Sequence, residues 1–135
     1  MTAQAATTTP SPAPHQIARR AGYALLAVAL TGLAVFELAR HGTGWWQFFV
    51  FGAGPDLALL VGIAPGLAAG QLHPRAVPLY NLLHRFYGPL LLALAAITGL
   101  LGAGYLVGAL AWGVHIALDR AVGYGLRTPD GFQRS

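Results

Sequence analysis

Cysteine and lysine are both absent from this chain, and charged side chains of either sign are few. The lack of cysteine excludes disulfides, thiolate metal sites and cysteine nucleophiles together. Charged residues make up only 9% of the 135 residues, whereas a soluble domain carries about 25%. Because apolar residues reach 56%, too little charge remains to cover a surface that faces water. The composition therefore indicates a membrane protein.

The positive charge of the chain comes from arginine alone. Eight arginines against four acids give a net charge of +4 and an isoelectric point near 10.1. A nucleic-acid-binding protein would gather such residues in a patch with aromatic or polar residues between them. The arginines instead stand singly or in pairs beside apolar runs, as the flanks of membrane helices do. We therefore predict the lipid bilayer as the main partner and no nucleic-acid partner.

Four apolar segments predict an all-α, polytopic integral membrane protein with four transmembrane helices in an antiparallel bundle. The segments are about 21–39, 45–63, 77–98 and 105–122. Their lengths approach the ~20 residues that a spanning helix needs. Residues 1–16, rich in Thr, Ala and Pro, are predicted to form a disordered tail. Residues 17–122 would then form the transmembrane domain, and 123–135 a cytoplasmic C-terminal tail.

The distribution of arginine predicts how the four helices are oriented. With four spans, both termini and the middle loop lie on the same side of the membrane. That side collects arginines 19, 20, 75, 120, 127 and 134, whereas the opposite side has Arg40. Cytoplasmic loops carry an excess of Lys and Arg. We therefore expect a multi-pass protein of a bacterial inner (plasma) membrane with both termini in the cytoplasm.

Prolines and glycines predict local features of these helices. Pro55 removes one helix hydrogen bond beside Asp56, and Pro89 predicts a second kink. A kink beside an acid can open a polar pocket; alternatively Asp56 caps a new helical segment, since Asp is a favoured N-cap. The G-x-x-x-G pair at 104 and 108 suits close helix packing. Glycines 123 and 125 favour a tight C-cap over the alternative, a flap that covers the pocket.

Hairpin geometry predicts that polar side chains from three helices meet at one depth. With the last turn centred near position 101, His84 and Asp119 each lie about 17 residues from it, or ~26 Å along a helix. They should therefore be level. Centring the middle loop near position 70 makes Asp56 level with His84 as well. His115 and Asp119 share one helix face, as i and i+4 positions do, and Asn81 shares a face with His84.

Charged groups at such a depth need partners, because each unpaired one costs about 2.5–3.5 kcal/mol at the middle of the membrane. Two carboxylates and two imidazoles can bind a divalent metal such as zinc, iron or manganese. The metal-ligand candidates are Asp56, His84, His115 and Asp119. The alternative is a hydrogen-bonded network that holds the helices in register, with Arg85 or Arg120 neutralising the acids. No motif such as H-E-x-x-H or G-x-S-x-G occurs, so no catalytic residue is predicted.

Several local strings resemble those of one bacterial membrane family. They are Pro55-Asp56, Leu79-Tyr80-Asn81-Leu82-Leu83-His84, the string at 112–120, and Gly123-Tyr124-Gly125-Leu126-Arg127 with Gly131-Phe132. These strings resemble the family catalogued as domain of unknown function 4260, and the resemblance covers roughly Ala21 to Gln133. Membership implies a four-helix membrane protein with no assigned activity.

Several functions stay open at this point. The first is a membrane-embedded, metal-dependent enzyme with the four acid and imidazole side chains as ligands or acid–base groups. Its supporting polar network would consist of Tyr80, Asn81, Arg85 and Arg120. The second is a non-catalytic subunit whose polar network holds helix packing for a membrane partner protein or a homo-oligomer. A haem between His84 and His115 is disfavoured by their ~6 Å difference in depth, and a proton-coupled carrier would require oligomerisation.

Overall fold

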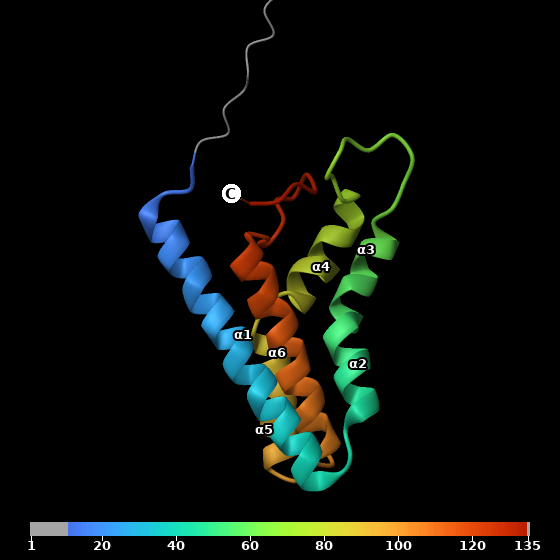
Figure 1. The fold of residues 1–135 in the computed structure, drawn as a ribbon. Coiled ribbons are helices and arrows are strands. Elements are labelled where there is room, and N and C mark those ends of the chain that lie inside the picture. Colours follow the sequence, from blue (N-terminus) through green and yellow to red (C-terminus); the bar gives the residue numbers. More distant parts are fainter. Residues whose placement is uncertain (1–10, 135) are drawn as a thin grey trace, which may run out of the picture.

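Residues 11–134 form an all-α structure in the computed structural model (Figure 1). The helices are α1 (Pro14–His41), α2 (Trp45–Ala53), η1 (Gly54–Asp56, 3-10), α3 (Leu57–Val61), η2 (Pro74–Ala76, 3-10), α4 (Val77–Leu83), α5 (Tyr87–Ile97) and α6 (Gly104–Val122). The described residues contain no strand, and Arg127 and Gln133 form one isolated β-bridge. The predicted all-α class is confirmed.

The elements run up and down along a common direction. The start of α1, the loop between α3 and η2 and the C-terminal segment lie at one end of the bundle (Figure 1). The turns that follow α1 and α5 lie at the other end. Helix α1 begins at Pro14, seven residues before the predicted start, so the last part of the predicted tail is helical. Residues 1–10 of that tail lie outside the described residues.

Helix α6 is the central element, because it contacts α1, α2 and α5. Its buried positions are mostly small residues: Gly104, Val107, Gly108, Ala109, Ala111, Gly113, Ile116 and Ala117. A Cβ atom at Gly108 would lie 2.6 Å from the ring of Phe51, and one at Gly104 would lie 2.6 Å from the Gln47 amide. The close packing predicted from the G-x-x-x-G spacing is thus confirmed for α2 against α6.

Helices α4 and α5 are separated by a break at residues 84–86. Pro89 has no N–H to donate to the carbonyl of Arg85, and its ring crowds that carbonyl, so a continuous helix is disfavoured there. Two carbonyls freed by the break receive hydrogen bonds from α6. Trp112 Nε1 donates to the Leu83 oxygen at 2.7 Å, and an Arg120 nitrogen donates to the His84 oxygen at 2.9 Å. Side chains of α6 therefore donate hydrogen bonds to backbone carbonyls that the break leaves without helical partners.

The C-terminal segment folds back against α4. Gly123 has a φ of +98°, and the Tyr124 N–H donates to the Asp119 carbonyl at 2.8 Å, which is the predicted C-cap. The Asn81 amide then pairs with both backbone groups of Arg127: its nitrogen donates at 3.0 Å and its oxygen accepts at 2.7 Å. These contacts place the C-terminal segment on α4 rather than free in solvent.

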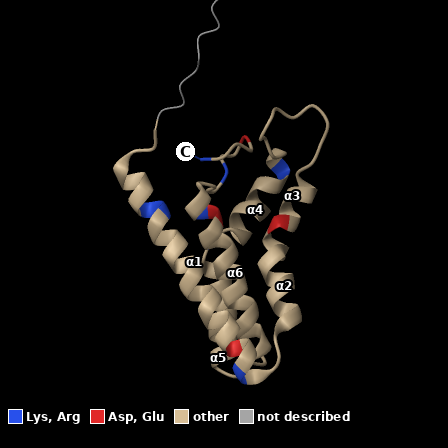
Figure 2. Cartoon of the chain, viewed as in Figure 1, with Lys and Arg blue, Asp and Glu red and all other residues tan. Residues whose placement is uncertain are grey.

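One helix of the described part of the chain, α1, is long and apolar enough to cross a membrane by length and composition. It lies near the N-terminus, and the apolar stretches Trp45–Val61 and Tyr87–Ile97 are shorter. Figure 2 shows long parts of α1, α2 and α5 without charged positions. Large apolar side chains with at least half of their surface exposed occur on several helices, among them Leu25, Val28, Phe49, Leu60, Leu91 and Ile97.

Candidate metal centre

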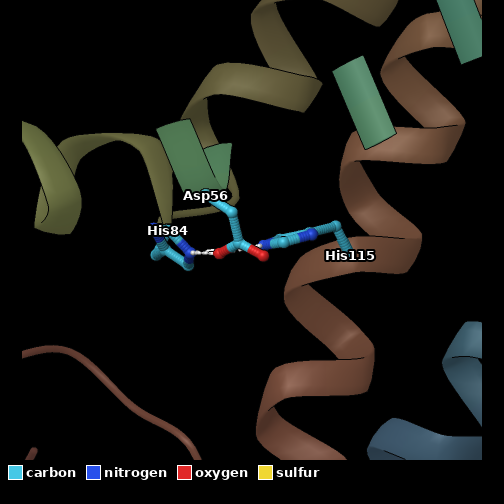
Figure 3. A group of neighbouring side chains, drawn as sticks. All are labelled: Asp56, His84 and His115. Carbon is cyan, nitrogen blue, oxygen red and sulfur yellow. Dashed lines mark hydrogen bonds and ion pairs between the residues drawn. The ribbon is translucent and has the colours of Figure 1, made fainter. Parts of the chain in front are cut away.

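Three side chains from separate elements point toward one another (Figure 3). Asp56 is the last residue of η1, His84 follows the end of α4, and His115 lies in the second half of α6. One donor atom from each lies within 4.8 Å of the other two. The structure therefore brings together three of the four predicted ligands in one group.

The fourth candidate, Asp119, contacts both imidazoles. Its Oδ2 lies 3.5 Å from His84 Nε2 and 3.7 Å from His115 Nε2. Asp56 Oδ1 lies 3.6 Å and 3.5 Å from the same two nitrogens, which are 3.2 Å apart. Asp119 Oδ2 lies about as close to the two imidazole nitrogens as Asp56 Oδ1 does. Asp119 therefore belongs to the same cluster of side chains as Asp56 and the two histidines.

The ring of His84 is held by its own helix. Its Nδ1 lies 2.8 Å from the Tyr80 carbonyl oxygen. Because a carbonyl only accepts, Nδ1 carries a proton, and in the neutral ring Nε2 presents its lone pair to the cluster. The imidazole is fully buried and stacks on the Tyr80 ring at 3.9 Å, and the Arg127 guanidinium lies 4.9 Å from that ring's centre. Metal-binding histidines usually donate the N–H of their other ring nitrogen to a carbonyl or a carboxylate in this way.

The position of Asp56 follows from the interruption at Pro55. This proline changes the helix to the 3-10 geometry of η1, and Asp56 becomes the N-cap residue of α3. Its carboxylate makes no capping hydrogen bond and contacts the two imidazoles instead. The capping alternative therefore does not describe Asp56. Its side chain is 53% exposed, so the cluster is accessible from this side.

The predicted supporting residues have different places. Tyr80 supports His84 directly, as described above. Asn81 holds the C-terminal segment and lies outside the cluster. Arg120 donates to the backbone oxygens of His84 and Tyr124, not to a carboxylate. Arg85 is exposed and forms no ion pair within residues 11–134. Within residues 11–134, neither arginine therefore forms an ion pair with either acid.

Trp112 supports the site, although sequence reasoning assigned it no role. Its indole N–H holds the Leu83 carbonyl next to His84, and its ring fills the space left by the missing side chain of Gly88. An indole N–H is a donor that needs an acceptor when it is buried. Trp112 lies three residues before His115 in the sequence. This spacing, together with the need of its N–H for an acceptor, could have predicted a supporting role beside the site.

The cluster has an excess of acceptor atoms. Two carboxylates and the His84 Nε2 lone pair can only accept hydrogen bonds, and in the described part of the chain the N–H available to face them is that of His115. Within residues 11–134, neither carboxylate receives a hydrogen bond from another protein donor. With both acids ionised and both imidazoles neutral, the group carries a charge of −2. A divalent cation would neutralise this charge at the point where the donor atoms converge.

The fold and this cluster define a class: a small helical protein with one membrane-length helix and a histidine/aspartate site at the junction of three elements. The chain belongs to the family described as domain of unknown function (DUF4260), whose model matches residues 22–135. The resemblance of its strings to that family is thereby confirmed. The curated proteins and the solved structures gave no match to the chain.

Proposed function

We propose that this protein is a four-span inner-membrane protein that binds a divalent metal through Asp56, His84, His115 and Asp119 near the cytoplasmic face. The metal would serve a membrane-embedded enzyme that acts on a lipid-soluble or membrane-proximal substrate. The observation that carries the proposal is the convergence of four acceptor-bearing side chains with too few protons among them. The exposed apolar surface supports the membrane location, and the distances between donor atoms support the metal site.

The membrane part is supported by helix length and by exposed apolar surface. At 1.5 Å per residue, the 17 residues of Trp45–Val61 extend about 25 Å and the 19 residues of α6 about 28 Å. Both lengths approach the ~30 Å hydrocarbon core of a bilayer. Leu25, Val28, Leu91 and Ile97 are each about 70% exposed. Large apolar side chains exposed on several helices suit contact with lipid.

The metal part is supported by the distances between donor atoms. Metal–ligand bonds of 2.0–2.1 Å in a tetrahedral site place neighbouring donors about 3.3–3.4 Å apart. The five separations around the two imidazoles range from 3.2 to 3.7 Å. Small side-chain adjustments would therefore produce a zinc site, and iron or manganese accept the same nitrogen and oxygen donors. The exposed side of Asp56 leaves room for a water or a substrate oxygen, which the ion would activate.

One observation favours the alternative, a non-catalytic subunit with a structural polar network. The two Nε2 atoms are 3.2 Å apart, so the His115 N–H could donate directly to His84 without any metal. That bond would still leave both carboxylates at 3.5 Å or more from a nitrogen. The same separation opposes a haem, because an iron between two axial nitrogens needs them about 4 Å apart.

Metal analysis of the purified protein tests the metal site. We expect about one zinc, iron or manganese ion per chain in protein purified in detergent without chelators, and near-background content in His84→Ala and His115→Ala. His41→Ala is the matched control, since His41 pairs with Glu37 at 3.1 Å away from the cluster. Wild-type protein that holds no metal even after incubation with each of the three ions would overturn the proposal. Circular dichroism of each variant separates loss of metal from loss of the fold.

The absence of cysteine makes the membrane topology directly testable. Single substitutions Thr43→Cys, Ala69→Cys and Asp130→Cys place one thiol in the α1–α2 turn, the middle loop and the C-terminal segment. In right-side-out vesicles a membrane-impermeant maleimide should label the first and spare the other two. Inverted vesicles should give the reverse pattern. Labelling of positions 43 and 69 from the same side would contradict four spans.

A further inference from the structure

Four arginines line one cavity at the end of the bundle where α1 begins. The cavity has a volume of about 480 Å³ and lies between the first turns of α1 and the segment that follows α6. Its arginines are Arg19, Arg20, Arg120 and Arg134, and its lining contains no acid. Within residues 11–134, none of the four forms an ion pair with a carboxylate. Like charges gathered in this way favour the binding of an anion.

Specific backbone features assemble these arginines. The guanidinium of Arg20 lies against Gly123, where a Cβ atom would be 2.9 Å from the Arg20 Cζ. Arg120 is held by the carbonyls of Tyr124 and His84 at 3.0 and 2.9 Å, which leaves further N–H groups free to bind. The C-terminal segment turns back on itself, and the backbone N–H of Arg134 donates to the Leu126 carbonyl at 2.9 Å. This bond brings Arg134 to the cavity. The cavity is therefore built by the fold.

A second, less polar hollow of about 420 Å³ adjoins the arginine cavity, since both are lined by Tyr23 and Arg120. The other walls of this hollow are His84, Arg85, Phe86, Tyr87 and Leu90, so its apolar part lies toward the start of α5. Tyr87 and Leu90 are 69% and 63% exposed, so the hollow opens on the outer surface of the bundle. A basic cavity next to a less polar hollow with exposed Tyr87 and Leu90 suits a ligand with an anionic head and a hydrocarbon chain.

We propose that the arginine cavity binds the phosphate group of a membrane amphiphile, with the hydrocarbon chain lying along Tyr87 and Leu90. Guanidinium groups bind phosphate oxygens through paired hydrogen bonds. Basic pockets between helices on the cytoplasmic side of a membrane bind anionic lipid head groups. The phosphate site stands on the cavity alone, whereas the placement of the chain rests on the proposed membrane location. The arginine cavity itself contains none of the metal-cluster residues, whereas the adjoining hollow is lined by His84 and Arg120 donates to the His84 carbonyl.

Calorimetric titration of the detergent-purified protein tests this site with three probes: dihexanoyl phosphatidic acid, dihexanoyl phosphatidylcholine and inorganic phosphate. We expect one phosphatidic acid to bind per chain, with weaker binding of inorganic phosphate and of phosphatidylcholine. Losing a charge-assisted hydrogen bond costs about tenfold in affinity. The double variant Arg19→Gln/Arg20→Gln should therefore bind phosphatidic acid about 100-fold more weakly. Arg75→Gln is the matched control, because Arg75 lies at the same end of the bundle outside the cavity.

Each outcome separates the parts of the proposal. Equal weakening by Arg75→Gln, or no weakening by the double variant, would overturn the site and leave general charge attraction as the cause. Equal affinity for inorganic phosphate and phosphatidic acid would overturn the amphiphile and identify free phosphate as the ligand. Thermal unfolding of the double variant checks its fold. Metal content measured on the same preparations shows whether the phosphate site and the metal centre fail independently.

Discussion

Replacing Asp119 by Asn should have opposite effects on stability without metal and on metal binding. In the absence of metal, the carboxylate lies 3.5 and 3.7 Å from two imidazole nitrogens, is 21% exposed and contributes to an excess of acceptors. An ionised Asp costs about 2.5–3.5 kcal/mol at mid-membrane, and its partial exposure reduces this cost to roughly 1–2 kcal/mol. An amide removes the charge and supplies two N–H donors to the neighbouring acceptors.

The magnitude can be expressed as a melting temperature. For a chain of this size, 1 kcal/mol corresponds to roughly 4 °C. The Asp119→Asn protein in EDTA should therefore melt roughly 4–8 °C above the wild type. Zinc at 100 times its dissociation constant should stabilise the wild type by about 2.7 kcal/mol, or roughly 10 °C. If the amide weakens zinc binding 100-fold, that increment falls to about 0.4 kcal/mol.

Scanning fluorimetry of the detergent-purified protein measures the melting temperature in EDTA and the increase in melting temperature across a zinc titration. Asp130→Asn is the control, since Asp130 is an exposed acid of the C-terminal segment and its replacement should change neither value. A drop in the melting temperature of Asp119→Asn in EDTA, by several degrees, would refute the reasoning. It would mean that the carboxylate pairs with a protonated imidazole in a structural network. An unchanged zinc increment would exclude Asp119 as a ligand.

Three further substitutions test the supports of the site by thermal unfolding or proteolysis. Trp112→Phe leaves the Leu83 carbonyl without its donor and should cost about 1–3 kcal/mol in unfolding free energy; no change in melting would refute this. Gly88→Ala inserts a Cβ atom against the Trp112 ring and should cost about 1–3 kcal/mol through overpacking. A melting temperature equal to wild type would show that the ring can move away. Asn81→Ala removes both hydrogen bonds to Arg127, so trypsin should cleave the C-terminal segment faster, whereas Asn81→Asp should restore part of the protection.

The place of the site along the helices was predictable from the sequence, because distance along a helix is proportional to residue number. Counting residues from the turns made His84 level with Asp56 and with Asp119. In the structure, His84 Nε2 lies 3.6 Å from Asp56 Oδ1 and 3.5 Å from Asp119 Oδ2. Pro55 and Pro89 also marked the two breaks beside the site. The estimated ~6 Å difference in depth between His84 and His115 did not prevent contact, since their side chains span it.

The partner of each polar side chain was not predictable in the same way. Asn81 shares a helix face with His84 in a regular helix, but α4 ends at Leu83 and Asn81 faces Arg127 of the C-terminal segment. Its partner lies 46 residues away in an irregular segment, so no periodic pattern encodes the contact. The arginine cavity likewise joins the start of α1 to the end of the chain, and the sequence separation of those elements conceals it.

Composition, proline positions and residue spacing by themselves determined the helical class, the two breaks and the depth at which acids and imidazoles gather. The tertiary structure alone decided which atoms face each other: the Nε2 atoms of both histidines toward the acids, and Arg120 toward backbone carbonyls. The physical reason is that helix rotation and the direction of the chain at a break depend on packing against α6. Its small buried residues and its Trp112 and Arg120 side chains set that packing.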